Sequence, residues 1–267
     1  MKYAFMTFSC PELTLDEALS AAKEYGYDGI EPRVGSNHKH GIELDATAAD
    51  RRKAKEKAEA AGIALCCVAT SCRFADPASA DAAVSDARKA IDLAADIGSP
   101  RVRVFGGKFP DAMSRDDAVA QVEKCLDALK DHAGERDVVL CVESHDAWCD
   151  PGDLARVIRA VDHPAVAVNW DIMHPVRAAG ATMDSAFEAL KPWIRHVHCH
   201  DGVWSTDGRP QLVPIGQGRV DHRRALELLK GMDYDGFVSG EWIGWRPYPD
   251  HLPSELATLK TYEAEMG

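Results

Sequence analysis

Eight short apolar segments alternate with eight alanine-rich segments along this chain of 267 residues. The short segments are rich in Val, Ile and aromatic residues and lack the strict alternation of a half-exposed antiparallel sheet, so they are predicted as buried strands. These strands cover residues 2–8, 28–33, 63–69, 101–105, 138–143, 166–171, 194–199 and 236–241. The longer segments have helical periodicity and cover residues 14–25, 47–61, 79–97, 115–133, 152–161, 182–190, 221–231 and 253–265. Eightfold alternation of strand and helix predicts a (β/α)8 barrel, in which helices cover a closed parallel sheet.

The ends of several predicted helices carry local signals. A glycine that can adopt a positive φ follows five of them, at Gly26, Gly62, Gly98, Gly134 and Gly231. Ser114 and Asp221 are predicted N-caps, because their side-chain oxygens can accept from free backbone N–H groups. No linker or change of composition divides the chain, so residues 1–267 are predicted as one domain. One barrel of this kind typically has about 250 residues.

The charge and the cysteines narrow the classes of function. The net charge is −12, and a chain this acidic without a strong basic cluster is poorly suited to a nucleic-acid backbone. No apolar run of about 18 residues suggests a membrane span, and residues 1–8 lack the pattern of a signal peptide. The eight cysteines show no repeated C-x-x-C pair, which favours buried reduced thiols. We therefore expect a cytoplasmic protein that binds neither nucleic acid nor membrane.

Four of the predicted strands end in residues that can bind a metal ion, namely Glu143, Asp171, His198 and Glu241. Successive members are 28, 27 and 43 residues apart, and a strand, loop, helix and loop need roughly 25 to 40 residues. One ligand per successive unit would place all four at the same end of the barrel. Carboxylates with one imidazole suit a single divalent cation, Mn²⁺ first, with Mg²⁺, Co²⁺ or Zn²⁺ as alternatives. The competing interpretation is a set of barrel-lining polar residues that pair with one another.

Motifs around these positions resemble a known superfamily. They are Tyr-Asp-Gly-Ile-Glu at residues 27–31, His-Val-His-Cys-His-Asp at 196–201, Ile-Gly-Gln-Gly-Arg-Val-Asp at 215–221 and Gly-Phe-Val-Ser-Gly-Glu-Trp at 236–242. With the four strand ends, they resemble the xylose isomerase-like TIM-barrel superfamily, also called the sugar phosphate isomerase/epimerase or AP endonuclease family 2 group.

The resemblance implies a ligand set and a reaction. The metal ligands would be Glu143, Asp171, His198 and Glu241. The two glutamates would also act as acid and base on opposite faces of a metal-bound carbonyl substrate. Proton removal α to the carbonyl would create an enediolate, whose charge the cation stabilises.

Three further histidines are candidates for the pocket. His174 follows Asp171 in a D-x-x-H pattern, whose histidine in the superfamily contacts substrate or, in the nucleases, metal; a structural helix-cap histidine is the alternative. His145 shares a strand face with Glu143, two residues earlier, and is a candidate second proton carrier. This Glu-x-His resembles the 3-dehydroshikimate dehydratase branch; a hydrogen-bonding wall residue is the alternative. His200 is expected to line the pocket rather than to bind the metal.

Other candidates for substrate contact lie at strand ends and in the loops that follow. Arg103 is a candidate clamp for a carboxylate, phosphate or hydroxyl pair, with a buried ion pair as the alternative. Glu31 and Arg33, at the end of the second strand, carry the same two interpretations. Flat apolar walls for a sugar or ring are expected from three tryptophans, for which core packing is the alternative: Trp204, Trp242 and Trp245.

The neighbours of the ligands separate branches of the superfamily. Endonuclease IV-type DNA repair is disfavoured, because predicted strands three and four end without a histidine and residues 220–222 read Val-Asp-His. Ketose 3-epimerases carry a Glu six residues after the first ligand and an Arg six after the metal histidine, where this chain has Cys149 and Trp204. Hydroxypyruvate isomerases read Glu-Pro at the fifth strand, where this chain reads Glu-Ser at residues 143–144.

We therefore expect a metal-dependent isomerase or epimerase of a small carbohydrate or cyclic keto-polyol. The alternative enzyme is a lyase of the 3-dehydroshikimate or inosose dehydratase type that uses Glu143 and His145. A non-catalytic sugar-binding or scaffold protein is the third class. A homo-oligomer is compatible with all three.

Overall fold

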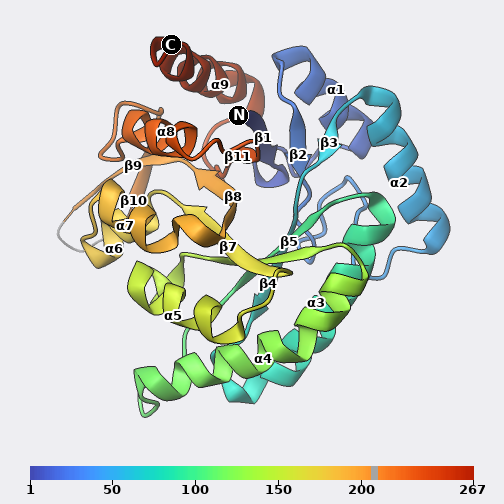
Figure 1. Cartoon of the computed structure of the whole chain (residues 1–267). Helices are drawn as coiled ribbons and strands as arrows, with labels where there is room; N and C mark the ends of the chain where they lie inside the picture. The colour runs from blue at the N-terminus through green and yellow to red at the C-terminus, as the bar shows by residue number, and fades with distance from the viewer. Residues whose placement is uncertain (206–209) are drawn as a thin grey trace.

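Nine parallel strands form a nearly closed barrel with helices around it in the computed structural model, which describes residues 1–205 and 210–267 (Figure 1). In order around the sheet they are β3 (Ala64–Leu65), β2 (Gly29–Glu31), β1 (Lys2–Met6), β11 (Phe237–Gly240), β8 (Ile194–Cys199), β7 (Val166–Asp171), β6 (Val139–Glu143), β5 (Arg101–Phe105) and β4 (Val68–Arg73). The predicted (β/α)8 fold is confirmed.

The third predicted strand is the one that departs from expectation. Residues 63–69 contain two pieces, β3 paired with β2 and the start of β4 paired with β5, and an isolated bridge joins Arg33 to Ala69 between them. Buried backbone groups released by such a break need other partners. The side chain of Arg33 donates to the carbonyl of Ala69, and that of Arg103 donates to the carbonyl of Thr70. Arginine side chains therefore help to close the barrel here.

Eight helices match the eight predicted segments and surround the strands. They are α1 (Leu15–Tyr25), α2 (Ala48–Ala61), α3 (Pro77–Ile97), α4 (Arg115–Glu135), α5 (Pro151–Val161), α7 (Met183–Leu190), α8 (His222–Gly231) and α9 (Tyr248–Glu265). The short α6 (His174–Ala179), which was not predicted, lies in the connection that follows β7. Three 3₁₀ turns, η1 (Thr7–Ser9), η2 (Asp146–Trp148) and η3 (Lys191–Trp193), complete the helical elements of the described chain.

Helix ends test the local signals in the sequence. As predicted, left-handed glycines end three helices and side-chain N-caps begin two, at Gly26, Gly62, Gly98, Ser114 and Asp221. The predictions for Gly134 and Gly231 are wrong, because both lie inside the last turn of their helices. Just beyond them Asp137 and Asp233 take φ angles of 54° and 55°. An aspartate tolerates this conformation because its short side chain bonds locally, so glycine is not needed there.

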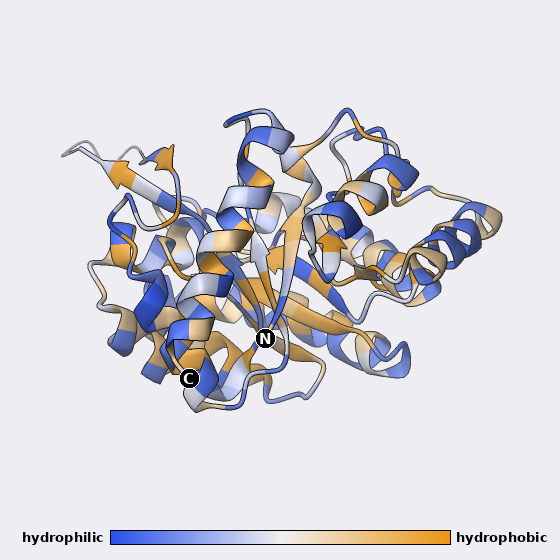
Figure 2. Cartoon of the chain, turned by 90° about the horizontal axis from the view of Figure 1, so that it is seen from above, coloured by the Kyte–Doolittle hydropathy of each residue, from blue (hydrophilic) through white to orange (hydrophobic). Residues whose placement is uncertain are grey.

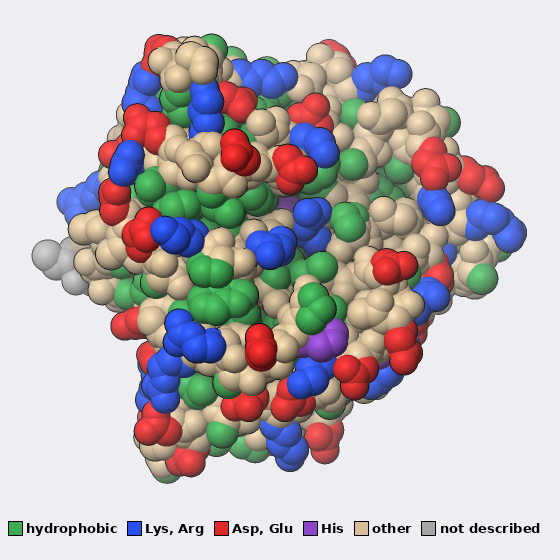
Figure 3. Space-filling view, viewed as in Figure 1, with side chains coloured by type: hydrophobic (Ala, Val, Ile, Leu, Met, Phe, Trp, Pro, Cys, Tyr) green, Lys and Arg blue, Asp and Glu red, His purple; other side chains and the backbone are tan. Residues whose placement is uncertain are grey.

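A single large cluster of buried apolar residues joins the barrel strands to the surrounding helices. Figure 2 shows hydrophobic residues concentrated on the central strands. In α5, for example, Leu154, Val157, Ile158 and Val161 recur at helical spacing and all are buried. All eight cysteines are also buried and unpaired, as predicted. On the face seen in Figure 3, Lys and Arg side chains are interspersed with Asp and Glu. Within the described residues, no helix has the length and apolarity needed to cross a bilayer.

A hairpin, absent from the predicted elements, projects from one end of the barrel. Strands β9 (Asp201–Trp204) and β10 (Pro210–Val213) pair antiparallel as a separate two-stranded sheet. Figure 2 shows the hairpin at the end of the barrel opposite the two chain termini. The strands end on that side, so the hairpin stands beside the strand-end loops that carry the chemistry of such barrels.

Candidate metal centre

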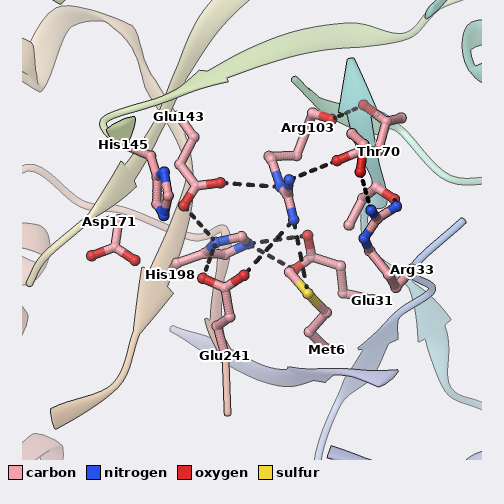
Figure 4. Close-up of polar contacts among 12 residues, drawn as sticks. Met6, Glu31, Arg33, Thr70, Arg103, Glu143, His145, Asp171, His198 and Glu241 are labelled. Atoms are coloured by element: carbon pink, nitrogen blue, oxygen red, sulfur yellow. Dashed lines mark hydrogen bonds and ion pairs between the residues drawn. The ribbon is translucent and has the colours of Figure 1, made fainter. Parts of the chain in front are cut away.

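The four predicted metal ligands meet at the carboxyl ends of neighbouring strands. Glu143 and Asp171 are the last residues of β6 and β7, His198 lies opposite Asp171 in β8, and Glu241 directly follows β11. One ligand atom from each of the four lies within 4.8 Å of every other (Figure 4). None of the four is more than 5% exposed. Residues spread over about a hundred positions thus form one buried cluster.

His198 is held in the tautomer that a metal site requires. Its Nε2 lies 3.1 Å from both oxygens of Glu31, and a carboxylate only accepts, so this nitrogen carries the hydrogen. Nδ1 then bears the lone pair in the neutral ring, 3.5 Å from Glu143 Oε1 and from Glu241 Oε2. Burial lowers the pKa of His198, but the carboxylates of Glu31 and Glu143 outweigh it and raise the pKa well above its ordinary value. The arrangement of acceptors calls for a cation, either a proton or a metal ion.

Several buried atoms of the cluster have no hydrogen-bond partner among the described residues. They are both carboxylate oxygens of Glu143, Asp171 Oδ2 and His198 Nδ1. Two of them, Glu143 Oε2 and Asp171 Oδ2, have ion-pair contacts with Arg103 and His200. Buried polar groups usually have hydrogen-bond partners, so the unsatisfied atoms that face one another here mark a position for a missing ligand. Three carboxylates and one imidazole match the preferences of hard or borderline divalent cations. The donor set therefore fits a divalent metal.

Backbone groups orient Asp171 toward the cluster. The N–H groups of Met173 and His174, at the turn into α6, donate to its Oδ1 at 2.8 and 3.0 Å. This leaves Oδ2 facing His200 Nε2 at 3.2 Å. The Nδ1 of His200 donates to the backbone carbonyl of Glu241 at 2.9 Å. Although burial opposes it, the nearby carboxylate of Asp171 raises the pKa of His200 to about 9. The two groups therefore form a charged pair next to the space between the four candidate ligands, which is called the ion position below.

His145 and His174 lie together beside the ligands, with ring centroids 4.1 Å apart. The Nδ1 of His145 is 3.0 Å from Asp146 Oδ1, and despite burial this carboxylate and that of Glu143 raise the pKa of His145. His174 differs, because burial lowers its pKa to about 4. Arg177 donates to its Nδ1 at 3.1 Å, which leaves the hydrogen of the neutral ring on Nε2. One basic and one neutral imidazole thus border the cluster.

Two residues predicted as substrate contacts, Glu31 and Arg103, have buried protein partners. Glu31 is fully buried behind His198, where it also accepts from His196 Nε2 at 2.9 Å. Arg103 is 1% exposed and lies between Glu143 and Glu241. Glu31 thus accepts buried hydrogen bonds from two histidines, and Arg103 forms buried ion pairs with the two glutamates.

Arg33 and the predicted aromatic walls have protein contacts of their own. Arg33 donates to Ala69 and Val34 carbonyls and to Ser71 Oγ. Among the described residues, no hydrogen bond, ion pair or ring contact joins the three predicted tryptophans to the ligands. Trp242 and Trp245 pack against His251 of α9, and Trp204 on β9 lies near the Arg219 guanidinium.

Three residues of the site were not identified from the sequence: His196, Asp146 and Arg177. His196 and His198 alternate along β8 and His200 directly follows it with the same spacing, so the three are expected to share the inner face of the barrel. That spacing in the sequence could have identified His196 as a residue of the site. Asp146 follows His145 directly, and its φ of 51° is unusual for a residue with a side chain. Arg177 lies one helical turn beyond His174 on α6.

Known proteins resemble this chain in sequence and in fold. The family model described as xylose isomerase-like TIM barrel matches residues 19–262. In sequence, a curated 3-dehydroshikimate dehydratase from Bacillus anthracis is 28% identical over 125 residues, which cover 42% of this chain and 43% of that protein. The chain is thus matched to less than half of that relative's length.

Two solved structures match nearly the whole chain. The probable 3-dehydroshikimate dehydratase of petrobactin synthesis from Bacillus anthracis superposes with a TM-score of 0.79 at 20% identity, covering 97% of this chain and 99% of that one. The 3-keto-D-glucoside 4-epimerase from E. coli superposes with a TM-score of 0.79 at 18% identity, covering 98% and 99%. At these identities the likeness shows a shared fold.

Proposed function

Because the chain belongs to the xylose isomerase-like TIM-barrel family, we propose that it is a divalent-metal-dependent isomerase or epimerase of a small carbohydrate or cyclic keto-polyol. One observation carries the proposal. Glu143 and Glu241 reach the same ion position from different strands, each with one oxygen 3.5 Å from His198 Nδ1. Figure 4 shows their carboxylates on either side of that ring. Two carboxylates so placed can remove a proton on one side of a substrate and deliver one on the other.

The ligands are suited to a single cation, and Mn²⁺ is our first choice for three carboxylates with one imidazole. When bound, such an ion polarises a carbonyl and stabilises the charge of the enediolate. One of the glutamates, Glu143 or Glu241, takes the proton from the carbon α to the carbonyl, and the other returns a proton to the neighbouring atom or the opposite face. The neutral His174, with its hydrogen on Nε2, would donate a hydrogen bond to a substrate oxygen.

A dehydratase is the second candidate, and His145 is the observation that favours it. Its ring lies between the Asp146 carboxylate and His174, next to Glu143. In an elimination, a base takes the α-proton, the electrons of that C–H bond form the C=C bond, and the β-hydroxyl leaves. A protonated His145 would supply the proton that turns the leaving hydroxyl into water. The sequence match to a 3-dehydroshikimate dehydratase supports this alternative.

Deuterium exchange separates the two reactions. We would incubate the Mn²⁺-loaded protein in D₂O with keto-sugars, keto-acids and cyclic polyol ketones, and follow the products by mass spectrometry and NMR. With an isomerase or epimerase, the product gains deuterium and keeps all its oxygen atoms. With a dehydratase, the product has lost one molecule of water. Glu241→Gln serves as the control for exchange at the site. A complete panel with neither deuterium uptake nor water loss would contradict both proposals and favour a non-catalytic binding protein.

A further inference from the structure

Arg103 is enclosed by the barrel and contacts residues of β1, β4 and β6 and the glutamate that follows β11 (Figure 4). Its Nη1 donates to the carbonyl of Thr70 on β4 at 2.7 Å, and the Thr70 hydroxyl donates to the Arg103 carbonyl at 2.8 Å. Its Nε lies 3.1 Å from Glu143 Oε2, and its Nη2 lies 3.8 Å from Glu241 Oε1. The guanidinium therefore links a carbonyl near the break between β3 and β4 to both glutamates of the site.

In both glutamates, one carboxylate oxygen faces Arg103 and the other faces His198. Glu143 turns Oε2 to Arg103 and Oε1 to His198 Nδ1, while Glu241 turns Oε1 to Arg103 and Oε2 to His198 Nδ1. Each carboxylate thus presents a single oxygen to the ion position. We propose that Arg103 is a positioning residue that holds both glutamates in this one-oxygen arrangement and balances their charge when no ion is bound. The inference rests on the proposed metal-dependent function.

The electrostatics of the cluster explain why a cation is needed at this place. Three buried carboxylates have ligand oxygens within 4.8 Å of one another, and like charges this close disfavour the folded protein unless an opposite charge is present. The planar guanidinium can contact two carboxylates and a carbonyl at the same time. A lysine ammonium on a flexible stem is less suited to this. With 1% exposure, Arg103 offers almost no surface to a substrate.

The experiment compares Arg103→Met and Arg103→Lys with the wild type, after removal of metal with EDTA and again after addition of Mn²⁺. Arg101→Met is the matched control, because Arg101 lies at the other end of the same strand. The measurements are the unfolding temperature and, for the loaded enzymes, KM and kcat separately. Loss of one partner of a buried ion pair should lower the unfolding temperature of metal-free Arg103→Met by at least about 6 °C. Mn²⁺ should restore much of this loss.

The expected result is therefore a larger Mn²⁺-induced rise in unfolding temperature for Arg103→Met than for the wild type. Arg103→Lys should show a smaller effect of the same sign, and Arg101→Met should keep the wild-type response. An unfolding temperature of metal-free Arg103→Met within about 2 °C of wild type, a fraction of the expected loss, would overturn the inference. A raised KM in Arg103→Lys with unchanged kcat and stability would assign Arg103 to substrate binding instead.

A double variant gives a second test, which needs no metal and remains informative if Arg103→Met does not fold. In the metal-free double variant Arg103→Met with Glu143→Gln, the charge left unpaired by the first substitution is removed, so stability should exceed that of Arg103→Met alone. If Arg103→Met does not fold, recovery of a folded protein by the second substitution is the expected result; no recovery contradicts the inference. Lack of any Mn²⁺ effect on the wild type would contradict the metal-dependent function, while this comparison would still decide the role of Arg103.

Discussion

Replacement of Glu31 by glutamine should weaken metal binding although Glu31 does not reach the ion position. Its carboxylate accepts from His198 Nε2 at 3.1 Å and from His196 Nε2 at 2.9 Å, in a fully buried location. A glutamine amide has the same shape but turns one of the two oxygens into an N–H₂ donor. One of the two histidines must then face a donor.

Because Oε2 accepts from both histidines and Oε1 from His198 alone, the amide nitrogen is expected at the Oε1 position, where it faces His198. A change of tautomer by His198 would relieve this conflict. If Nε2 becomes the acceptor of the amide, the hydrogen moves to Nδ1, the atom that lies 3.5 Å from Glu143 Oε1 and Glu241 Oε2. The lone pair required by a metal is then lost. Removal of a carboxylate behind a metal-binding histidine typically weakens affinity by about 10- to 100-fold, which corresponds to about 1.4 to 2.8 kcal/mol. We expect Glu31→Gln to fall in this range.

Isothermal titration of EDTA-treated protein with MnCl₂ measures the effect directly. Glu24→Gln, an exposed replacement of the same type on α1, should bind as the wild type does. Turnover of Glu31→Gln should recover at high Mn²⁺, because the two glutamates proposed to transfer protons are unchanged. An Mn²⁺ affinity within twofold of wild type in a correctly folded Glu31→Gln would refute the tautomer argument.

Three further outcomes are expected. His198→Ala should lose the roughly one divalent ion per chain expected of the wild type while keeping its fold, as elemental analysis and circular dichroism would show; a retained ion would place the metal elsewhere. Glu241→Gln should lower kcat by at least about 100-fold, the scale of an acid–base group, and near-normal turnover would remove it from proton transfer. Burial raises the pKa of Glu255, helped by Asp201, to about 7. Because this folded-state pKa lies above the unfolded value of about 4.5, stability should fall by roughly 3 kcal/mol as pH rises through that interval. Glu255→Gln should lose this pH dependence in urea unfolding, whereas an unchanged profile would assign it to other groups.

The sequence by itself determined the units of the barrel and the ligand series. Strands such as residues 138–143 and helices such as 152–161 have strong local periodicity, so their type and order follow from short-range pattern. The end of each strand is also a local feature. Because parallel strands end on one side of a barrel, Glu143, Asp171, His198 and Glu241 could be assigned to one place without knowledge of any contact. Family membership confirms the fold that this pattern implied.

Only the tertiary structure decided what faces each polar side chain. Arg103 and Glu31 were candidates for substrate contact, and the pattern of the sequence does not distinguish a strand-end residue that faces the pocket from one that faces another strand. Their partners, Glu143 and His198, lie 40 and 167 residues away in the chain, and such pairings depend on how the barrel closes. The break between β3 and β4 has the same origin, because strand pairing is a long-range interaction. Local chemistry thus placed the ligands, and barrel closure decided how they are held.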